Sequence, residues 1–136
     1  MRKISRKGLV RKLDALVKQI VIARDGMCIV CGTTSNLTPG HLFSRVAYST
    51  RWDLDNVYAQ CLNCNFRHES DPYPMTQAVL EIFAGAREIK DPNDFKYDEA
   101  NEKLEALHYK YVHPVKFKTF ELEELYNNLS KSFLTD

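Results

Sequence analysis

The chain has 136 residues, of which 44% are hydrophobic and 27% charged, and this suits a soluble globular protein with one small core and appended helices. No apolar run approaches the roughly 18–20 residues that a membrane-spanning helix needs, so a membrane protein is not expected. The net charge of +1 does not by itself predict a nucleic-acid partner.

The charge is nevertheless distributed unevenly. Residues 1–24 hold eight Lys and Arg residues and one acid, Asp14, so this segment carries +7 and the rest of the chain carries −6. A basic arm on an otherwise acidic protein suits contact with phosphates, although a solvated helix face has the same composition. No apolar stretch or small-residue cleavage site follows the basic start, so we expect no secretory signal.

Four apolar residues of this segment recur at helical spacing, namely Leu9, Leu13, Leu16 and Ile20. They predict an amphipathic helix over residues 9–24 that ends near Gly26. The basic residues that lie off this stripe are candidates for contact with DNA phosphates, and they are Arg11, Lys12 and Lys18.

The four cysteines form two Cys-x-x-Cys pairs with 29 residues between them: Cys28, Cys31, Cys61 and Cys64. Without a secretory signal, disulfides explain them poorly. Each Cys-x-x-Cys pair can present two thiolates from one turn, and two such pairs closing one loop are typical of tetrahedral zinc. A redox role suits a lone pair better, so the sequence predicts a structural zinc site.

The residues between and after these pairs predict a small sheet followed by a helix. Residues 33–39 are turn-rich, a short strand is expected near 41–43, and residues 45–56 are expected to form a polar loop. A second strand over 57–60 leads into a helix that carries Cys61 and Cys64 at its start and runs to about Glu69. The sequence DPYP at 71–74 ends that helix.

The remaining residues show three apolar stripes at helical spacing. They consist of Met75, Ala78, Val79, Ile82 and Phe83, of Ala100, Leu104, Leu107 and Tyr111, and of Phe120, Leu125, Leu129 and Phe133. These stripes are core or partner surface, because the helices need one another, or a second chain, to bury them.

The loop closed by the cysteine pairs contains residues suited to phosphodiester hydrolysis. A neutral histidine, here His41, can accept a proton from water near pH 7. A divalent metal can neutralise the phosphate and stabilise the leaving 3′-oxygen. Asn65 precedes His68 by three residues and Glu69 by four, so these side chains share a helix face and are candidates to hold that metal. Asn56 lies between His41 and Asn65 in the sequence, and we expect it to fix the loop backbone of the catalytic site rather than to react.

In residue order and spacing, residues 28–69 resemble the HNH nuclease superfamily, through the motifs CIVCG, GHLFSR and RWDLDNVYAQCLNCN. Within it the chain is most similar to the phage NinG/Rap recombination nucleases and the endonuclease VII-type junction resolvases. The NinG-like features are the glycine before His41, the spacing from Asn56 to Cys61, and the pair Gln60-Cys61. The C-terminal part matches only in being helical.

This resemblance implies an α+β fold with a small zinc-stapled ββα-metal core, similar to a treble clef. It implies a DNA endonuclease that uses Mg²⁺ or Mn²⁺ on branched DNA, such as four-way junctions, during phage recombination. The protein would then act in the bacterial cytoplasm and be encoded by a phage or prophage. Because a junction resolvase cuts two strands symmetrically, a homodimer is expected.

Transferred by position, the resemblance makes His41 the general base, Asn56 the residue that bonds backbone across the loop and orients it, and Asn65 a metal ligand. The cysteines would bind a structural zinc. The commoner HNH pattern has an Asp or His ligand directly before the base, whereas this chain has Gly40, which offers no ligand atom. Candidates to replace that ligand are His68 and Glu69, favoured because they share a helix with Asn65, and Asp53 and Asp55.

Two arginines of the loop, Arg45 and Arg51, are candidates to clamp phosphate, because a guanidinium offers paired donors. Salt bridges with Asp53 or Asp55 are the alternative. Trp52 is predicted to lie in the core rather than to wedge against DNA.

The sequence therefore predicts a basic helix at 1–26, the zinc-stapled core at 27–72, and a helical region for dimerisation or DNA contact at 73–136. Two alternatives to a branch-specific nuclease remain. One is a non-catalytic zinc-binding nucleic-acid adaptor, which Gly40 favours, and the other is a general HNH nicking endonuclease without branch preference.

Overall fold

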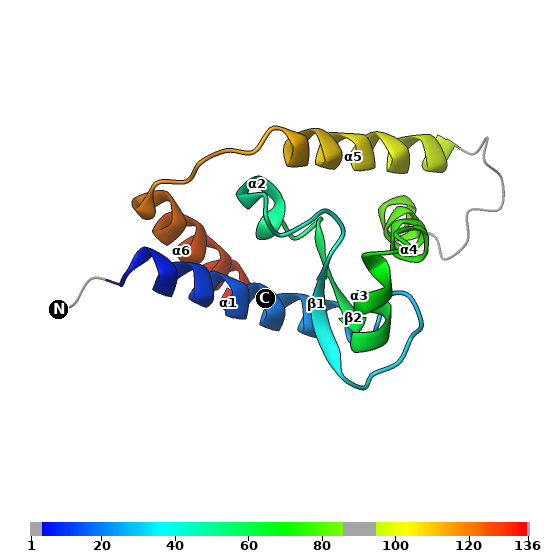
Figure 1. Ribbon diagram of the computed structural model, residues 1–136, viewed down its shortest axis with the longest axis horizontal. Helices are drawn as coiled ribbons and strands as arrows, with labels where there is room; N and C mark the ends of the chain where they lie inside the picture. The colour runs from blue at the N-terminus through cyan, green and yellow to red at the C-terminus, as the bar shows by residue number, and fades with distance from the viewer. Residues whose placement is uncertain (1–3, 86–94, 136) are drawn as a thin grey trace.

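A computed structural model describes residues 4–85 and 95–135 of the chain, with side chains described for 4–85 and 98–134. Arg2 and Lys3 of the basic arm lie outside these residues. The elements run in the order α1 (Arg6–Asp25), β1 (Leu37–His41), α2 (Tyr48–Arg51), β2 (Val57–Cys61), α3 (Leu62–His68), α4 (Tyr73–Ala84), α5 (Phe95–Val112) and α6 (Thr119–Thr135). Figure 1 shows a small sheet at the centre with helices around it, an α+β arrangement as the sequence predicts.

The first helix has the limits that its capping residues impose. Its N-cap is Ser5, whose hydroxyl oxygen accepts a hydrogen bond of 3.0 Å from the backbone N–H of Gly8. At the other end Gly26 takes the left-handed conformation with φ of 69° and donates its N–H to the carbonyl of Ile22. The helix therefore begins three residues earlier than the apolar stripe predicts and ends one residue later.

The first strand lies at Leu37–His41, four residues earlier than predicted, so the expectation of a turn over 33–39 was wrong for its last three residues. Pro39 pairs with Ala59 of the antiparallel strand β2. Ala59 directs its N–H to the carboxylate of Asp25 and its carbonyl to the N–H of Ile29, away from β1. The proline is therefore not required to donate a hydrogen bond at this position, and the strand tolerates it.

The predicted loop at 45–56 contains a short helix, α2, at Tyr48–Arg51, so this part of the prediction was also wrong. Helix α5 crosses over it, as Figure 1 shows at the top of the molecule. The hydroxyl of Ser49 donates to the carbonyl of Lys110 at 2.7 Å, and the ammonium of Lys110 lies 2.6 Å from the carboxylate of Asp53. The helical turn is thus held by a tertiary contact that its own sequence does not signal.

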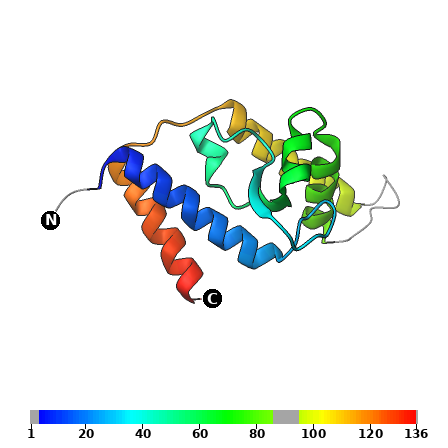
Figure 2. The same cartoon turned by 60° about the horizontal axis from the view of Figure 1, so that its bottom comes forward.

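Two apolar clusters make the core, and both join distant parts of the chain. The first contains Leu9, Leu13, Val17 and Val21 of α1 with Trp52, Val57 and Leu122. The second contains Leu42, Tyr58, Met75, Val79 and Leu107. Helix α6 returns to pack along α1, which is visible in Figure 2. Much of each C-terminal apolar stripe is therefore at least partly buried within one chain, without a second copy.

Within the described residues, no helix combines the length and the apolar character that crossing a membrane requires.

Candidate metal centre and adjoining cleft

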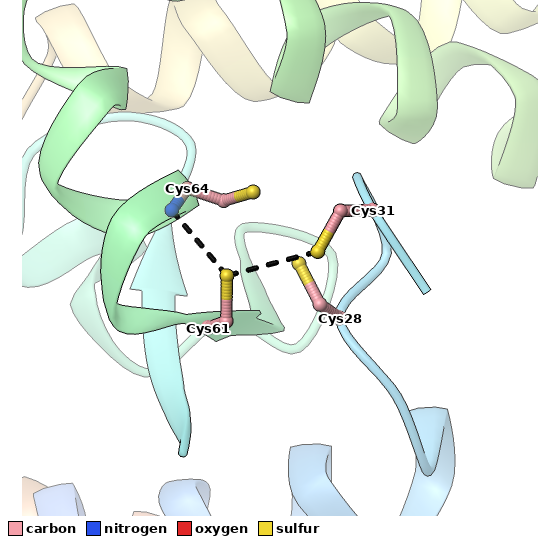
Figure 3. Close-up of side chains that lie close together, drawn as sticks. All are labelled: Cys28, Cys31, Cys61 and Cys64. Carbon is pink, nitrogen blue, oxygen red and sulfur yellow. Dashed lines mark hydrogen bonds between the residues drawn. The ribbon is translucent and has the colours of Figure 1, made fainter. Parts of the chain in front are cut away.

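The four cysteines gather at the ends of two turns. Cys28 and Cys31 lie in the loop after α1, where the N–H of Gly32 donates to the carbonyl of Cys28. Cys61 ends β2 and caps α3, because its sulfur accepts a hydrogen bond of 3.5 Å from the N–H of Cys64. Figure 3 shows the sulfurs converging from these two turns. Each pair is thus arranged locally, and the fold brings the pairs together.

The cluster has the dimensions of a tetrathiolate zinc site. All four sulfur atoms lie within 4.8 Å of one another, and those of Cys31 and Cys61 are 3.7 Å apart. Four sulfurs around zinc at about 2.3 Å are separated by about 3.8 Å, whereas a disulfide bond is much shorter. Among the residues that the structure describes, this is the one group of three or more His, Cys, Asp or Glu side chains close enough to hold a metal ion.

The protonation of the thiols also fits a cation at this position. Burial raises the pKa of Cys28, but backbone N–H groups, first that of Cys31, outweigh it and bring the pKa to about 7. Burial and then the neighbouring thiols raise the pKa of Cys64 above its ordinary range. A thiolate at Cys64 is therefore disfavoured beside the other three thiols, and a divalent metal ion would supply the compensating charge.

A cleft of about 530 Å³ opens beside this centre. The predicted site residues that line it are His41, Arg45, Arg51, Asn65, His68 and Glu69. Asp53 and Asp55, which the sequence left as candidate metal ligands, are not among the lining residues, and they contact Lys110 and Lys103 of α5. The structure thus brings His41 and Asn65 to one cleft, whereas Asn56 and these two aspartates do not line it.

His41 lies at the end of β1 with its Nε2 atom 3.0 Å from the carbonyl oxygen of Arg51. A carbonyl can only accept, so Nε2 carries the hydrogen and the lone pair of the neutral ring lies on Nδ1. Burial lowers the pKa of His41 below its ordinary value of 6.5, against a smaller opposing effect of the Arg51 carbonyl and of Asp14. The ring is therefore neutral at pH 7, as a proton acceptor must be.

Asn56 is fully buried and bonds backbone across the loop, as the sequence predicts for it. Its amide oxygen accepts from the N–H of Phe43 at 2.8 Å, and its amide nitrogen donates to the carbonyls of Phe43 and Thr50, each at 3.0 Å. These bonds fix the loop that follows His41 to the loop that supplies the carbonyl beside its ring. Asn56 acts on the site through that backbone.

The three remaining candidates lie on helix α3 and at its C-cap, Glu69. The amide nitrogen of Asn65 donates to the hydroxyl of Thr38 at 3.1 Å, which leaves the amide oxygen as the atom suited to a metal. The Nε2 atom of His68 donates to the carbonyl of Leu42 at 2.9 Å, and its Nδ1 atom is buried. Glu69 is exposed and lines the cleft. As the side chains lie, Asn65 and Glu69 offer oxygen atoms to the cleft, and both nitrogens of His68 are turned to other surroundings.

The two arginines of the loop differ in their surroundings. Arg45 is exposed at the cleft, whereas the guanidinium of Arg51 is held by the carboxylate of Asp14 at 2.7 and 3.0 Å. The partner of Arg51 is thus neither Asp53 nor Asp55. The same carboxylate accepts from the indole N–H of Trp52 at 2.9 Å, and Trp52 is buried in the core as predicted. Arg45 is therefore the better candidate for binding phosphate.

The predicted basic residues of α1, namely Arg11, Lys12 and Lys18, are exposed to solvent, and the ammonium of Lys12 lies over the ring of Tyr126. Asp14 on the same helix was not predicted to belong to the site. A signal was present, since it is the one acid among the first 24 residues, but nothing in the sequence pairs it with Arg51.

The chain matches no protein-family model, no curated protein and no solved structure.

Proposed function

We propose that this chain is a metal-dependent DNA endonuclease of the HNH type. The observation that carries the proposal is the lining of one cleft by His41, Asn65, Glu69 and Arg45, beside a four-cysteine cluster with zinc dimensions. The order β1, β2, α3, with His41 ending the first strand and Asn65 on the helix, supports a ββα-metal core of treble-clef type. The HNH resemblance of residues 28–69 supports the same activity.

In this proposal His41 is the general base. Its Nδ1 atom takes a proton from the attacking water, and the Arg51 carbonyl keeps the other nitrogen protonated and the ring in one orientation. A lowered pKa keeps the ring in its accepting form at neutral pH. Asn56 maintains the geometry by fixing the loop backbone on both sides of the site.

The residues of the cleft fit a hard divalent cation such as Mg²⁺ or Mn²⁺. Such an ion is commonly held by one or two carboxylate or amide oxygens together with water and substrate phosphate, and here Asn65 and Glu69 offer those oxygens. When bound, the ion neutralises charge on the phosphate and on the leaving oxygen. His68 is an equal candidate by sequence, but we assign it a positioning role because its nitrogens are turned away from the cleft.

Arg45 is proposed to bind the phosphate beside the scissile bond, and the exposed basic residues of α1 to contact the DNA backbone further away. Branched DNA is the proposed substrate because NinG-like nucleases are the nearest resemblance. A symmetric double cut on such DNA calls for a homodimer. A molar mass of one chain at the concentration that supports cleavage would contradict this last part.

The test is cleavage of a labelled four-way junction and of a linear duplex of the same sequence, with Mg²⁺ or Mn²⁺. His41→Ala should slow cleavage by about 10²–10⁴-fold while leaving DNA binding intact, since binding depends on Lys and Arg. His113→Ala is the matched control, because His113 is exposed and does not line the cleft. Equal rates for His41→Ala and wild type would refute the mechanism, and equal cleavage of both DNAs would indicate a nicking enzyme without branch preference.

The second candidate function is a zinc-stapled adaptor that binds nucleic acid without cutting it. Gly40 favours this function, because the residue directly before His41 has no side chain that could hold a metal. Titration with Mn²⁺ separates the two functions, since a paramagnetic ion in the cleft broadens the NMR signals of Asn65 and Glu69. Broadening at millimolar Mn²⁺ favours the enzyme, and its absence favours the adaptor.

A further inference from the structure

A second, smaller space adjoins His68 on the side away from the carbonyl of Leu42. It is a cavity of about 10 Å³ whose walls include Gln60 of β2, Cys64 and His68 of α3, and Met75 of α4. It thus adjoins Cys64 of the cysteine cluster and His68, which also lines the cleft. A volume of this size is that of about one water molecule.

Three buried polar atoms belong to the walls of this cavity. They are Oε1 and Nε2 of Gln60 and Nδ1 of His68, and within the described part of the chain none of them has a hydrogen-bond partner. Gln60 is completely buried. Because buried polar groups in native proteins are almost always paired with protein or with ordered water, this concentration at one small cavity calls for a partner.

Gly40 explains how the glutamine reaches this position. In the antiparallel register Gly40 pairs with Tyr58 and Gln60 pairs with Thr38, so Gly40 and Gln60 share one face of the sheet. A Cβ atom at residue 40 would overlap Oε1 of Gln60. The glycine before His41 therefore makes room for a buried amide, and its presence has a reason in packing.

The chemistry of the wall atoms favours water over an ion. Since Nε2 of His68 donates to the Leu42 carbonyl, its Nδ1 atom is an acceptor and needs a donor. The amide of Gln60 offers both donor and acceptor atoms. Gln60 and His68 are neutral, and the wall also contains one base and one acid, Arg67 and Asp71, whose charges offset each other. A buried divalent ion would therefore keep an uncompensated charge, whereas a water can donate to His68 and accept from Gln60.

We propose that Gln60 and His68 hold one buried water between the cysteine cluster and the cleft, and that Gln60 is thereby a positioning residue. The water joins β2 to the end of α3 and keeps His68 in the tautomer with the hydrogen on Nε2. Asn65 lies one helical turn before His68 and Glu69 directly follows it, so their orientation in the cleft depends on the same contact. The water and the tautomer stand independently of the proposed cleavage chemistry.

The test uses the full-length zinc-loaded protein. A high-resolution crystal structure should show one water within hydrogen-bond distance of the Gln60 amide and of His68 Nδ1, with no anomalous metal signal at the position of that water. In ¹⁵N NMR, the Nδ1 resonance of His68 should be that of a hydrogen-bonded acceptor. A direct bond from Gln60 to His68, a metal ion, or a dry cavity would each overturn the proposal.

Gln60→Met keeps the length of the side chain and removes its polar atoms. It should expel the water and shift the Nδ1 resonance of His68 to that of an unbonded nitrogen, while zinc stays bound to the four cysteines. Met75→Leu changes the same cavity without changing a polar atom and should leave the resonance in place. An unchanged resonance in Gln60→Met, or an equal shift in both variants, would show that Gln60 does not position His68.

Discussion

The cysteine cluster and the cleft beside it are built in different ways. Each half of the cluster is made within four residues, and the N–H of Ile29, which donates to the carbonyl of Ala59, links the first half to the strand that ends at Cys61. The cleft takes its lining from α1, the end of β1, the following loop and α3. Its histidine is held by the backbone of Arg51, whose side chain is in turn held by Asp14 of α1. The first site is therefore defined by local spacing, and the second depends on the whole fold.

Removing the zinc that we expect at the four cysteines should have the largest effect, because the cluster holds the start of α3, which carries Asn65 and His68 of the cleft. A structural zinc site contributes about 10–16 kcal/mol of apparent binding free energy, which exceeds the net stability of most small domains. We expect Cys61→Ser, or chelation strong enough to remove the metal, to unfold the central sheet. The near-UV circular dichroism of Trp52 and Tyr58, both buried near the sheet, reports this loss.

The control for that experiment is a chelator that removes Mg²⁺ and leaves zinc bound, which should leave the spectrum unchanged. Native near-UV circular dichroism after zinc removal has been verified by metal analysis would contradict the prediction. It would also remove the contrast between the two sites, because the cleft would then be stable without the cluster.

The sequence predicts the four-cysteine cluster and most helices because those signals are short-range. Two Cys-x-x-Cys pairs and stripes such as Leu9 to Ile20 depend on residues within a few turns of one another. The strand containing Pro39 begins four residues before its predicted start. The strand tolerates Pro39 because the N–H and the carbonyl of Ala59, which is opposite the proline, bond to Asp25 and Ile29 instead. No rule of local propensity contains that contact.

The candidate site divides in the same way. The spacing of His41 and Asn65 to the cysteines predicts both as site residues, and the cleft does contain both. The sequence assigns no role to Asp14 or Gln60, because each acts through a tertiary contact. Asp14 contacts Arg51, and Gln60 fills the space above Gly40. The sequence predicts Arg51 as a phosphate ligand. Its neighbours in the sequence do not reveal that a carboxylate far away in the chain holds its guanidinium.

Gly40→Ala should give the next largest effect and tests whether packing explains the glycine. The new methyl group overlaps the buried Gln60 amide, so we expect a loss of about 1–3 kcal/mol in the free energy of unfolding. Urea denaturation measures it. In a Gln60→Ala background the same substitution should have a clearly smaller effect, because the amide is no longer present. Equal losses in the two backgrounds would show that Gln60 is not what excludes a side chain at 40.

Asp14→Ala tests the dependence of the cleft on α1. It leaves the buried indole N–H of Trp52 and the guanidinium of Arg51 without their carboxylate. We expect the free energy of unfolding to fall by about 1–2 kcal/mol. This is toward the low end for hydrogen bonds to a charged group, because Asp14 is partly exposed and screened by solvent. Asp14→Asn keeps an acceptor and should lose less. If neither variant changed the urea midpoint, α1 would not be energetically coupled to the cleft.

The smallest expected effect is a pH dependence of stability that comes from His41. Its pKa in the folded protein lies below the ordinary value of 6.5, mainly because of burial, so the unfolded chain binds the proton more readily. The stabilising contribution of the neutral ring is complete above pH 6.5 and is lost as the pH falls toward the folded-state pKa. A tenfold difference in proton affinity between the folded and unfolded chains corresponds to about 1.4 kcal/mol.

The measurement is the urea midpoint of wild type and of His41→Asn between pH 5 and pH 8. The stability difference between the two proteins should shrink as the pH falls, because only wild type loses the contribution of His41. Arg45→Ala removes a positive charge that lowers the pKa of His41, so in that variant the loss should be smaller and end at a higher pH. A difference that stays constant or grows on acidification would mean that the ring is not held neutral by the fold. The cleft would then lack the prepared base that distinguishes an enzyme from an adaptor.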